Sequence, residues 1–299
     1  MSNRIKGTAV KLTVSDRLFY IFIIISLAII FIIIAIPMWS TITLSFRPNT
    51  FIGSNLQGMF LMPWEWSTAA YKALLGNNGF LIAFSNSLKI FVFGVITSLF
   101  FTIPLAYALS IRTLPGRRFF SIFILIPYLF SVGLIPGYLV VVKLGLTNTL
   151  SSIFLPLAIS TYNCLIMRGF FEGIPDELKE SARIDGASEI TVLLRIILPL
   201  SKPIIMTIGL YYGVQFWNDF FHPMLYINRN DLQPLPILLR NILMASGMNE
   251  YVEVNAFGEA PVQAIKAASV FLAAIPMIIA YPFIQKYFTK GTLLGSVKG

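Results

Sequence analysis

The sequence predicts an all-α membrane protein with about six transmembrane helices. Hydrophobic residues make up 57% of the 299-residue chain and charged residues only 12%, and the mean hydropathy is +0.79. A soluble domain of this length needs more charge to cover its surface. The apolar stretches are continuous and lack the alternation of barrel strands, so the spans are predicted to be helices.

Six apolar stretches are long enough to cross about 30 Å of hydrocarbon. We expect spans near residues 18–46, 80–111, 119–143, 150–168, 203–226 and 264–288 of a single transmembrane domain, 1–299. The first stretch follows basic residues, as a signal peptide does. Its apolar core is longer than the ~7–15 residues of a signal, and no small-residue cleavage site follows. We therefore expect it to be retained as a helix.

The distribution of Lys and Arg predicts the orientation of these spans. The N-terminal region, the 112–118 turn, the 168–202 segment and the C-terminal tail together carry 15 such residues, against 5 in the opposite loops. Basic loops stay in the cytoplasm. Both termini should therefore be cytoplasmic, which agrees with an even number of spans.

Two sizeable loops, about 47–79 and 227–262, should lie on the outer side. The first contains Trp64 and Trp66. Tryptophans at this depth fit either interfacial anchors or part of a docking surface for an outside partner.

The composition also limits the kinds of site and partner. A lone cysteine, Cys164, excludes a disulfide within the chain and a Cys-rich metal site, and the lone His222 excludes a multi-His site. The net charge of +9 is more typical of basic cytoplasmic loops than of nucleic-acid binding. We expect membrane lipid around the chain, no nucleic-acid partner and no metal.

The stretch ELKESARIDGASEITVLLRIILPLSKP, residues 177–203, interrupts the apolar chain with charge. Pro175 can open a helix there, and acidic groups at Asp176 and Glu177 favour its positive end. Asp185 and Gly186 form a stop signal, because glycine adopts the left-handed cap conformation. A serine then caps a second helix that leads back to the membrane.

Two interpretations of this charged stretch remain open. Glu180 and Arg183 lie three residues apart and can pair on one face of the first helix. A solvated amphipathic loop lying on the lipid headgroups is one interpretation. The other is a rigid protrusion offered to a cytoplasmic partner, which explains why the segment contains this much helical order.

The same stretch resembles the cytoplasmic EAA loop of ABC-importer permease subunits. Glu180, Ser181, Ala182, Gly186 and Leu198–Pro199 fall at the family's spacing, with Ser181 replacing the usual first alanine. The flanking FFEGIPDEL and IDGAS resemble the carbohydrate-importer branch, of the maltose-importer type. Three further segments resemble that branch at the expected places: Asn86–Ser110, Trp217–Ile227 and Gly295–Gly299.

The resemblance implies a type I importer permease fold, a bacterial inner-membrane location and carbohydrate import, with oligosaccharides as the expected substrates. It also implies a second permease subunit, a pair of ATPase subunits and an extracytoplasmic sugar-binding protein. The chain contains no G-x-x-x-x-G-K-[ST] phosphate loop. ATP and Mg²⁺ are therefore expected in the partner ATPase, with no cofactor on this chain and no catalytic residue.

The resemblance assigns roles to two groups of residues. The short helix of the 169–202 loop should seat in a cleft of the ATPase through Glu180, Ser181, Ala182, Arg183, Asp185 and Gly186. The tail residues Gly295, Ser296, Val297, Lys298 and Gly299 should reach the ATPase interface. A frayed tail without a contact is the alternative for this Gly-rich end.

Polar residues inside the spans are candidates for the substrate pathway. A carboxylate at a helix centre, as expected for Asp219, costs about 2.5–3.5 kcal/mol and should face a cavity or a partner. It follows Trp217 and Asn218, and sugar sites typically combine an aromatic face with planar hydrogen-bonding groups. Packing of these three residues against the partner subunit is the alternative. Asn163 in the fourth span is a similar, weaker candidate.

Two other classes of function make different predictions. A self-sufficient secondary transporter or channel should contain internal repeats and intramembrane carboxylates for ion coupling. A membrane-embedded enzyme should cluster His, Asp, Glu or Cys within the spans. The sequence favours the importer subunit, because it has one such carboxylate and no convincing repeat.

Overall fold

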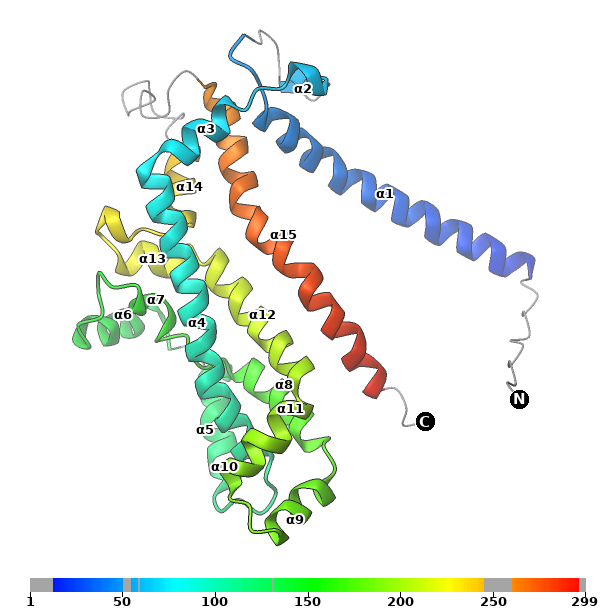
Figure 1. Cartoon of the computed structure of the whole chain (residues 1–299), viewed down its shortest axis with the longest axis vertical. Helices are drawn as coiled ribbons and strands as arrows, with labels where there is room; N and C mark the ends of the chain where they lie inside the picture. The colour runs from blue at the N-terminus through cyan, green and yellow to red at the C-terminus, as the bar shows by residue number, and fades with distance from the viewer. Residues whose placement is uncertain (1–12, 51–54, 59, 131, 245–259, 296–299) are drawn as a thin grey trace. The chain divides into compact units, whose positions relative to one another are not determined.

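The computed structural model describes residues 13–50, 55–58, 60–130, 132–244 and 260–295 (Figure 1). Within these residues the chain forms helices joined by turns, with no strand. The all-α prediction is therefore confirmed. By their contacts the residues divide into two compact units, one formed by 1–71 and 259–271 and the other by 72–258 and 272–299.

Three helices among the described residues are long and apolar enough to cross a membrane. They are α1 (Val14–Ser45), α4 (Asn78–Ser110) and α15 (Val262–Gly295). Their bounds extend the expected first, second and last spans by a few residues. Side-chain caps explain two of the starts, since Thr13 forms a capping box with Asp16 and Asn77 accepts a hydrogen bond from the Phe80 amide.

Two bent helix pairs are further candidate spans. α5 (Arg117–Leu129) and α6 (Leu134–Lys143) meet at 114°, where Gly133 has a φ of 73°. Helix α12 (Lys202–Asn218) meets the helical run before it at 84°, and Pro203 stands at its start. Counting each pair as one span gives up to five candidate spans in the described part of the chain.

The expected fourth span, 150–168, differs from the structure. The chain there forms the short α7 (Ser151–Phe154) and then α8 (Thr161–Glu172), which begins where the Ser160 hydroxyl caps the Asn163 amide. At 12 residues, and about 1.5 Å of rise per residue, α8 is shorter than the hydrocarbon is thick. The number of six spans stays a prediction.

The first unit gathers aromatic side chains at the end of α1. Phe46 stacks on Trp66 with 4.7 Å between the ring centroids, and the Ser45 and Tyr71 hydroxyls are 2.6 Å apart. The Trp66 indole N–H donates to the Leu61 carbonyl, whereas Trp64 is 80% exposed. Of the two tryptophans in the segment between α1 and α3 (Ala69–Gly76), only Trp64 is exposed.

The second unit has its core where α4, α8 and α12 pack together (Figure 1). Glycines allow α4 and α12 to approach closely. A Cβ built on Gly94 would lie 2.6 Å from the Phe216 ring, and one built on Gly213 would lie 2.6 Å from the Phe91 ring. Each helix therefore receives a phenylalanine ring of the other where it lacks a side chain of its own.

Short elements complete the chain. They are α2 (Asn55–Gly58), η1 (Pro63–Glu65), α3 (Ala69–Gly76), α9 (Asp176–Ile184), α10 (Glu189–Val192), η2 (Leu193–Ile197), α11 (Leu198–Leu200), α13 (Phe221–Tyr226), η3 (Asn230–Leu232) and α14 (Leu235–Met244). Four of them, α9, α10, η2 and α11, form the charged segment between α8 and α12, which we define as residues 173–201.

Candidate functional site

The charged segment folds as two helices at a sharp turn, as the sequence predicts. Gly186 has a φ of 81°, in the left-handed region. Its amide donates to the Arg183 carbonyl over 3.0 Å, and the Ala187 amide donates to the Ala182 carbonyl over 2.9 Å. This pair of bonds is the Schellman motif, which satisfies the last carbonyls of α9. The end of α9 therefore depends on a residue that tolerates a positive φ.

The second helix returns towards α12. The Ser188 hydroxyl caps the Thr191 amide at its start, as predicted. The run then widens into the π-helical turn η2 just before Pro199. Proline lacks an amide hydrogen and its ring displaces the carbonyl four residues earlier, and a π turn relieves that crowding.

The inner face of α9 is fastened to α8 by Lys179. This side chain is buried, with 5% of the residue exposed, and its ammonium donates to the Phe171 carbonyl over 3.3 Å and to Asp176 over 2.9 Å. The hydrogen bond from Lys179 lowers the pKa of the Asp176 carboxyl. Lys179 therefore caps the end of α8 and holds α9 against it.

A second fastening involves Glu189 at the start of α10. Its carboxylate accepts from the Arg183 guanidinium over 2.7 and 3.3 Å and from the Tyr107 hydroxyl of α4 over 2.7 Å. The hydrogen bond to Glu189 raises the pKa of Arg183. The expected pairing of Arg183 with Glu180 is wrong, because the guanidinium reaches across the Gly186 turn to a carboxylate in the next helix.

The opposite face of α9 is exposed. Glu177, Glu180 and Ile184 lie at positions i, i+3 and i+7, so they share one side of the helix. All three are exposed, and Ile184 is 86% exposed. Ser181 is also exposed, although its hydroxyl bonds back to the Leu178 carbonyl. This face of α9 therefore combines two carboxylates and one apolar side chain, none of which packs against the rest of the described chain.

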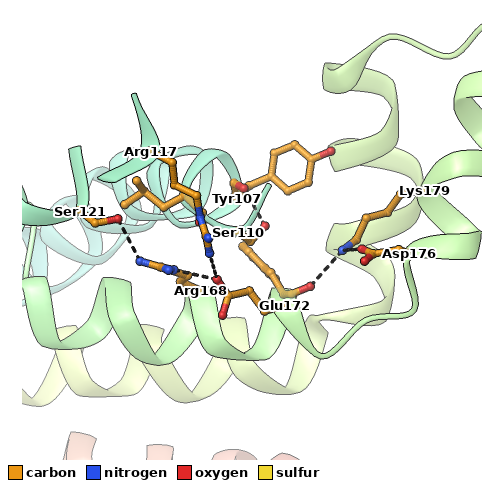
Figure 2. A network of polar contacts seen from close by, with 10 residues as sticks. Tyr107, Ser110, Arg117, Ser121, Arg168, Glu172, Asp176 and Lys179 are labelled. Atoms are coloured by element: carbon orange, nitrogen blue, oxygen red, sulfur yellow. Dashed lines mark hydrogen bonds and ion pairs between the residues drawn. The ribbon is translucent and has the colours of Figure 1, made fainter. Parts of the chain in front are cut away.

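A network of charged side chains joins the helix ends next to the charged segment (Figure 2). Glu172 at the end of α8 pairs with Arg117 and with Arg168, and Arg168 also donates to Ser121 over 3.1 Å. Arg117 donates in addition to the Leu109 carbonyl near the end of α4. Burial raises the pKa of Glu172, but Arg168 and Arg117 outweigh it and leave the pKa lowered. The ends of α4, α5 and α8 are thereby joined.

The four candidate substrate-pathway residues have different surroundings. Trp217 is buried, and its indole N–H donates to the Ala273 carbonyl of α15 over 3.1 Å. Asn218 donates to the Val214 carbonyl of its own helix, and Asn163 is buried within α8. Asp219 lies beyond the end of α12 rather than within a span, because it is the cap residue of that helix. The contacts of Trp217 and Asn218 are those of packing residues.

Asp219 instead holds a histidine at the edge of a cavity. Its carboxylate accepts from the His222 amide over 3.2 Å and contacts His222 Nδ1 at 2.8 Å. The ring of His222 lines a cavity of about 630 Å³ together with Tyr226, residues of α6 and the Leu155–Leu157 turn. A cavity of this size can take a small organic ligand. Sequence reasoning used His222 to exclude a multi-His site.

The structure describes little of the C-terminal tail. Gly295 is the last residue of α15, and Ser296, Val297, Lys298 and Gly299 lie outside the described residues. Within the described ranges, no group of three or more His, Cys, Asp or Glu side chains could hold a metal ion.

Sequence reasoning missed the residues that fasten the charged segment. These residues are Tyr107, Lys179 and Glu189. Except for the Asp176–Lys179 pair, their contacts join residues too far apart in the sequence to be predicted from helical spacing. The signal that was available for Glu189 was its place directly after the capping serine. That place indicated only a favourable acidic residue at a helix start.

The chain is similar to several known proteins. A family model described as binding-protein-dependent transport system inner membrane component matches residues 7–293. Protein LplC of Bacillus subtilis is 44% identical over 246 residues, which cover 81% of this chain and 83% of that protein. The polygalacturonan/rhamnogalacturonan transport system permease protein YtcP of the same organism is 40% identical over 241 residues, covering 80% and 84%.

One solved structure shares both fold and sequence with this chain. It is the crystal structure of a bacterial ABC transporter involved in the import of the acidic polysaccharide alginate. The match has a TM-score of 0.84 and 31% identity, and it covers 92% of this chain and 98% of the matched chain.

Proposed function

We propose, since the chain belongs to the family of binding-protein-dependent transport system inner membrane components, that it is the permease subunit of an ATP-driven carbohydrate importer. The observation that carries the proposal is the α9–Gly186–α10 turn. It has one face fastened to the membrane helices and the other exposed. A loop that only joined two spans would not need both features.

The charged segment is the part that meets the ATPase. The exposed Glu180, Ser181 and Ile184 and the turn at Asp185–Gly186 enter a cleft of the ATPase subunit, with Ala182 and Arg183 supporting them from the inner side. ATP and Mg²⁺ bind to that subunit and not to this chain. Closure of the ATPase pair moves the segment as a lever, and the spans alternate between outward and inward access.

The other partners and the orientation follow from the same scheme. The chain is a single permease domain, 1–299, in the cytoplasmic membrane of a bacterium, with both termini and the charged segment on the cytoplasmic side. A second permease subunit completes the pathway, and an extracytoplasmic sugar-binding protein meets the outer loops. The tail Gly295–Gly299 reaches the ATPase interface.

The substrate is an oligosaccharide. Of the similar proteins, YtcP is named for polygalacturonan and rhamnogalacturonan and the solved importer for alginate, which supports this class. The test is ATP hydrolysis by the intact complex, reconstituted with its binding protein. The panel comprises oligogalacturonides, alginate oligosaccharides and maltooligosaccharides. We expect one of them to stimulate hydrolysis severalfold.

Two results would contradict the proposal. If no ATPase purifies with the chain and uptake follows an ion gradient, the protein is a secondary transporter. If an ATPase is present but only non-carbohydrate solutes stimulate it, the substrate class is wrong.

The cavity beside His222 belongs to the substrate pathway in this scheme, with Asp219 orienting the histidine ring. Asp219→Ala should lower uptake about tenfold, because a misplaced hydrogen-bonding group commonly costs more than 1.4 kcal/mol. Complex assembly should be unchanged, since Asp219 contacts His222 and not a neighbouring span. Uptake assays with the stimulating oligosaccharide measure this effect. Asn218→Ala, which removes only a bond within α12, is the matched control, and equal uptake by both variants would remove Asp219 from the pathway.

Trp217 should behave differently from Asp219. Truncation of a buried tryptophan costs about 3–5 kcal/mol, and Trp217 also donates a hydrogen bond to α15. The Trp217→Ala variant should therefore lose thermal stability and yield. A lower uptake by this variant would reflect misfolding and not a role of Trp217 in the substrate pathway.

A further inference from the structure

Polar contacts form a closed circuit around Phe171 where the charged segment meets the membrane helices. From α4 the circuit runs through Arg117 to Glu172 of α8, and through Lys179 to α9. It returns from Arg183 through Glu189 to Tyr107 of α4. Phe171 is fully buried inside the circuit, and its ring meets that of Tyr107 edge to face at 6.4 Å. Figure 2 shows the part of the circuit formed by Arg117, Glu172 and Lys179, and the position of Tyr107 beside it.

Glu189 is the member of the circuit that joins three elements through one carboxylate. It begins α10, its Oε1 accepts from Arg183 Nε of α9, and its Oε2 accepts from the Tyr107 hydroxyl of α4. Oε2 also accepts from Arg183 Nη2 over 3.3 Å, so the guanidinium spans both carboxylate oxygens and the Tyr107 hydroxyl shares one of them. Movement of α9 about the Gly186 turn would therefore pull on Glu189 and, through it, on the Tyr107 hydroxyl of α4.

The exposure of this contact shows that its role is geometric. The side chains of Arg183 and Glu189 are 36% and 51% exposed, and exposed ion pairs contribute little to folding stability. The Tyr107 residue, in contrast, is 5% exposed, so its hydroxyl is held in place by the surrounding core. The contact therefore joins α9 and α10 to the buried end of α4 and is expected to contribute little to folding stability.

We propose that Glu189 is a positioning residue that transmits movement of α9 to the end of α4. This proposal rests on the function proposed above, in which α9 meets the ATPase. It adds a second path of transmission to the covalent one through α10 and α12. α4 is a long spanning helix that packs along α12, so both helices receive the movement together.

Two conservative variants separate this path from folding. Tyr107→Phe keeps the ring and its contact with Phe171 but removes the hydroxyl donor. Glu189→Gln keeps an oxygen acceptor but removes the charge that attracts Arg183. Asp231→Asn is the matched control, because Asp231 forms an exposed ion pair with Arg229 in η3, outside the circuit.

The measurement is amide hydrogen exchange on the intact permease–ATPase complex, with and without the non-hydrolysable nucleotide AMP-PNP and Mg²⁺. In the wild type, the nucleotide should change exchange both in α9 and at the end of α4, residues 103–110. In Tyr107→Phe and Glu189→Gln, we expect the change in α9 to persist and the change at the α4 end to fall at least about fivefold. The double variant should add little to either single variant, because both interrupt the same connection from Arg183 through Glu189 to Tyr107.

Each outcome decides between the proposals. A wild-type response at the α4 end in both variants, with an unchanged melting temperature, would overturn the role of Glu189 and leave the docking of α9 intact. If nucleotide produces no change in α9 of the wild-type complex, the docking proposal fails and this inference fails with it. Equal effects in Asp231→Asn would show that the response is a general consequence of lost surface charge, and would also overturn the proposal.

Discussion

Replacement of Gly186 by valine should uncouple the importer while the chain still inserts into the membrane. The glycine has a φ of 81°, and a β-branched residue in this region costs about 1–2 kcal/mol. Space is not the difficulty, since a Cβ at this position would meet no atom within 4 Å. The free-energy cost therefore comes from the backbone conformation of the turn. We expect α9 to be reoriented relative to α10.

The expected size of the effect follows from that conformational cost. A penalty of about 1–2 kcal/mol lowers the ratio of the native turn to other turn conformations roughly 5- to 30-fold, which sets the upper bound of the effect. Substrate-stimulated ATP hydrolysis by the purified complex should fall by up to this factor. Gly186→Asn is the matched control, because asparagine enters the left-handed region more readily than valine. Equal loss in both variants, or no loss in the valine variant, would contradict the role of the turn.

Charge reversal at Glu180 should release the ATPase from the complex. Glu180 lies on the exposed face of α9 between Glu177 and Ile184, which is the face that we propose to be buried on docking. Like charges brought together across an interface cost several kcal/mol, so Glu180→Lys should weaken ATPase binding by at least about thirtyfold. The ATPase recovered with the tagged permease after purification measures the change.

Two variants control for the added charge. Glu180→Gln removes the carboxylate without reversing the charge and should retain more ATPase than Glu180→Lys. Lys72→Glu reverses a charge at an exposed position outside the charged segment and should leave ATPase recovery unchanged. Wild-type recovery with Glu180→Lys would show that the exposed face of α9 is not the docking surface.

Local signals in the sequence predicted the turn of the charged segment well. The Asp185–Gly186 stop and the Ser188 cap lie as expected, because caps depend on residues within a few positions of one another. The long apolar runs likewise predicted α1, α4 and α15. The resemblance to importer permeases, based on the EAA loop and its flanks, is confirmed by the family match.

Breaks within the apolar runs were harder to predict. Hydropathy alone made 119–143 and 150–168 continuous spans, but the chain bends between α5 and α6 and is interrupted between α7 and α8. Glycine and proline are tolerated inside membrane helices when neighbouring groups satisfy the freed backbone. Their presence at Gly133 or Pro156 therefore did not decide whether the helix continued.

Long-range partners were beyond sequence reasoning for a different reason. Trp217 and Asp219 are neighbours in sequence, yet one packs against α15 and the other holds His222 beside a cavity. Arg183 was matched with Glu180 because helical spacing places them together, but the Gly186 turn brings Glu189 closer to the guanidinium. Only the folded arrangement distinguishes such alternatives.

The docking of α9 on the ATPase can be measured directly by labelling a cysteine at its exposed face. The chain has one cysteine, Cys164, and it is buried, so a Cys164→Ser background provides a single site at Ile184→Cys. We expect a maleimide reagent to label this site in the permease pair without ATPase and to label it at least about tenfold more slowly in the full complex. Trp64→Cys, at a residue that is 80% exposed and lies outside the charged segment, should react equally in both. If Ile184→Cys reacts at the same rate with and without the ATPase, α9 is not the docking helix.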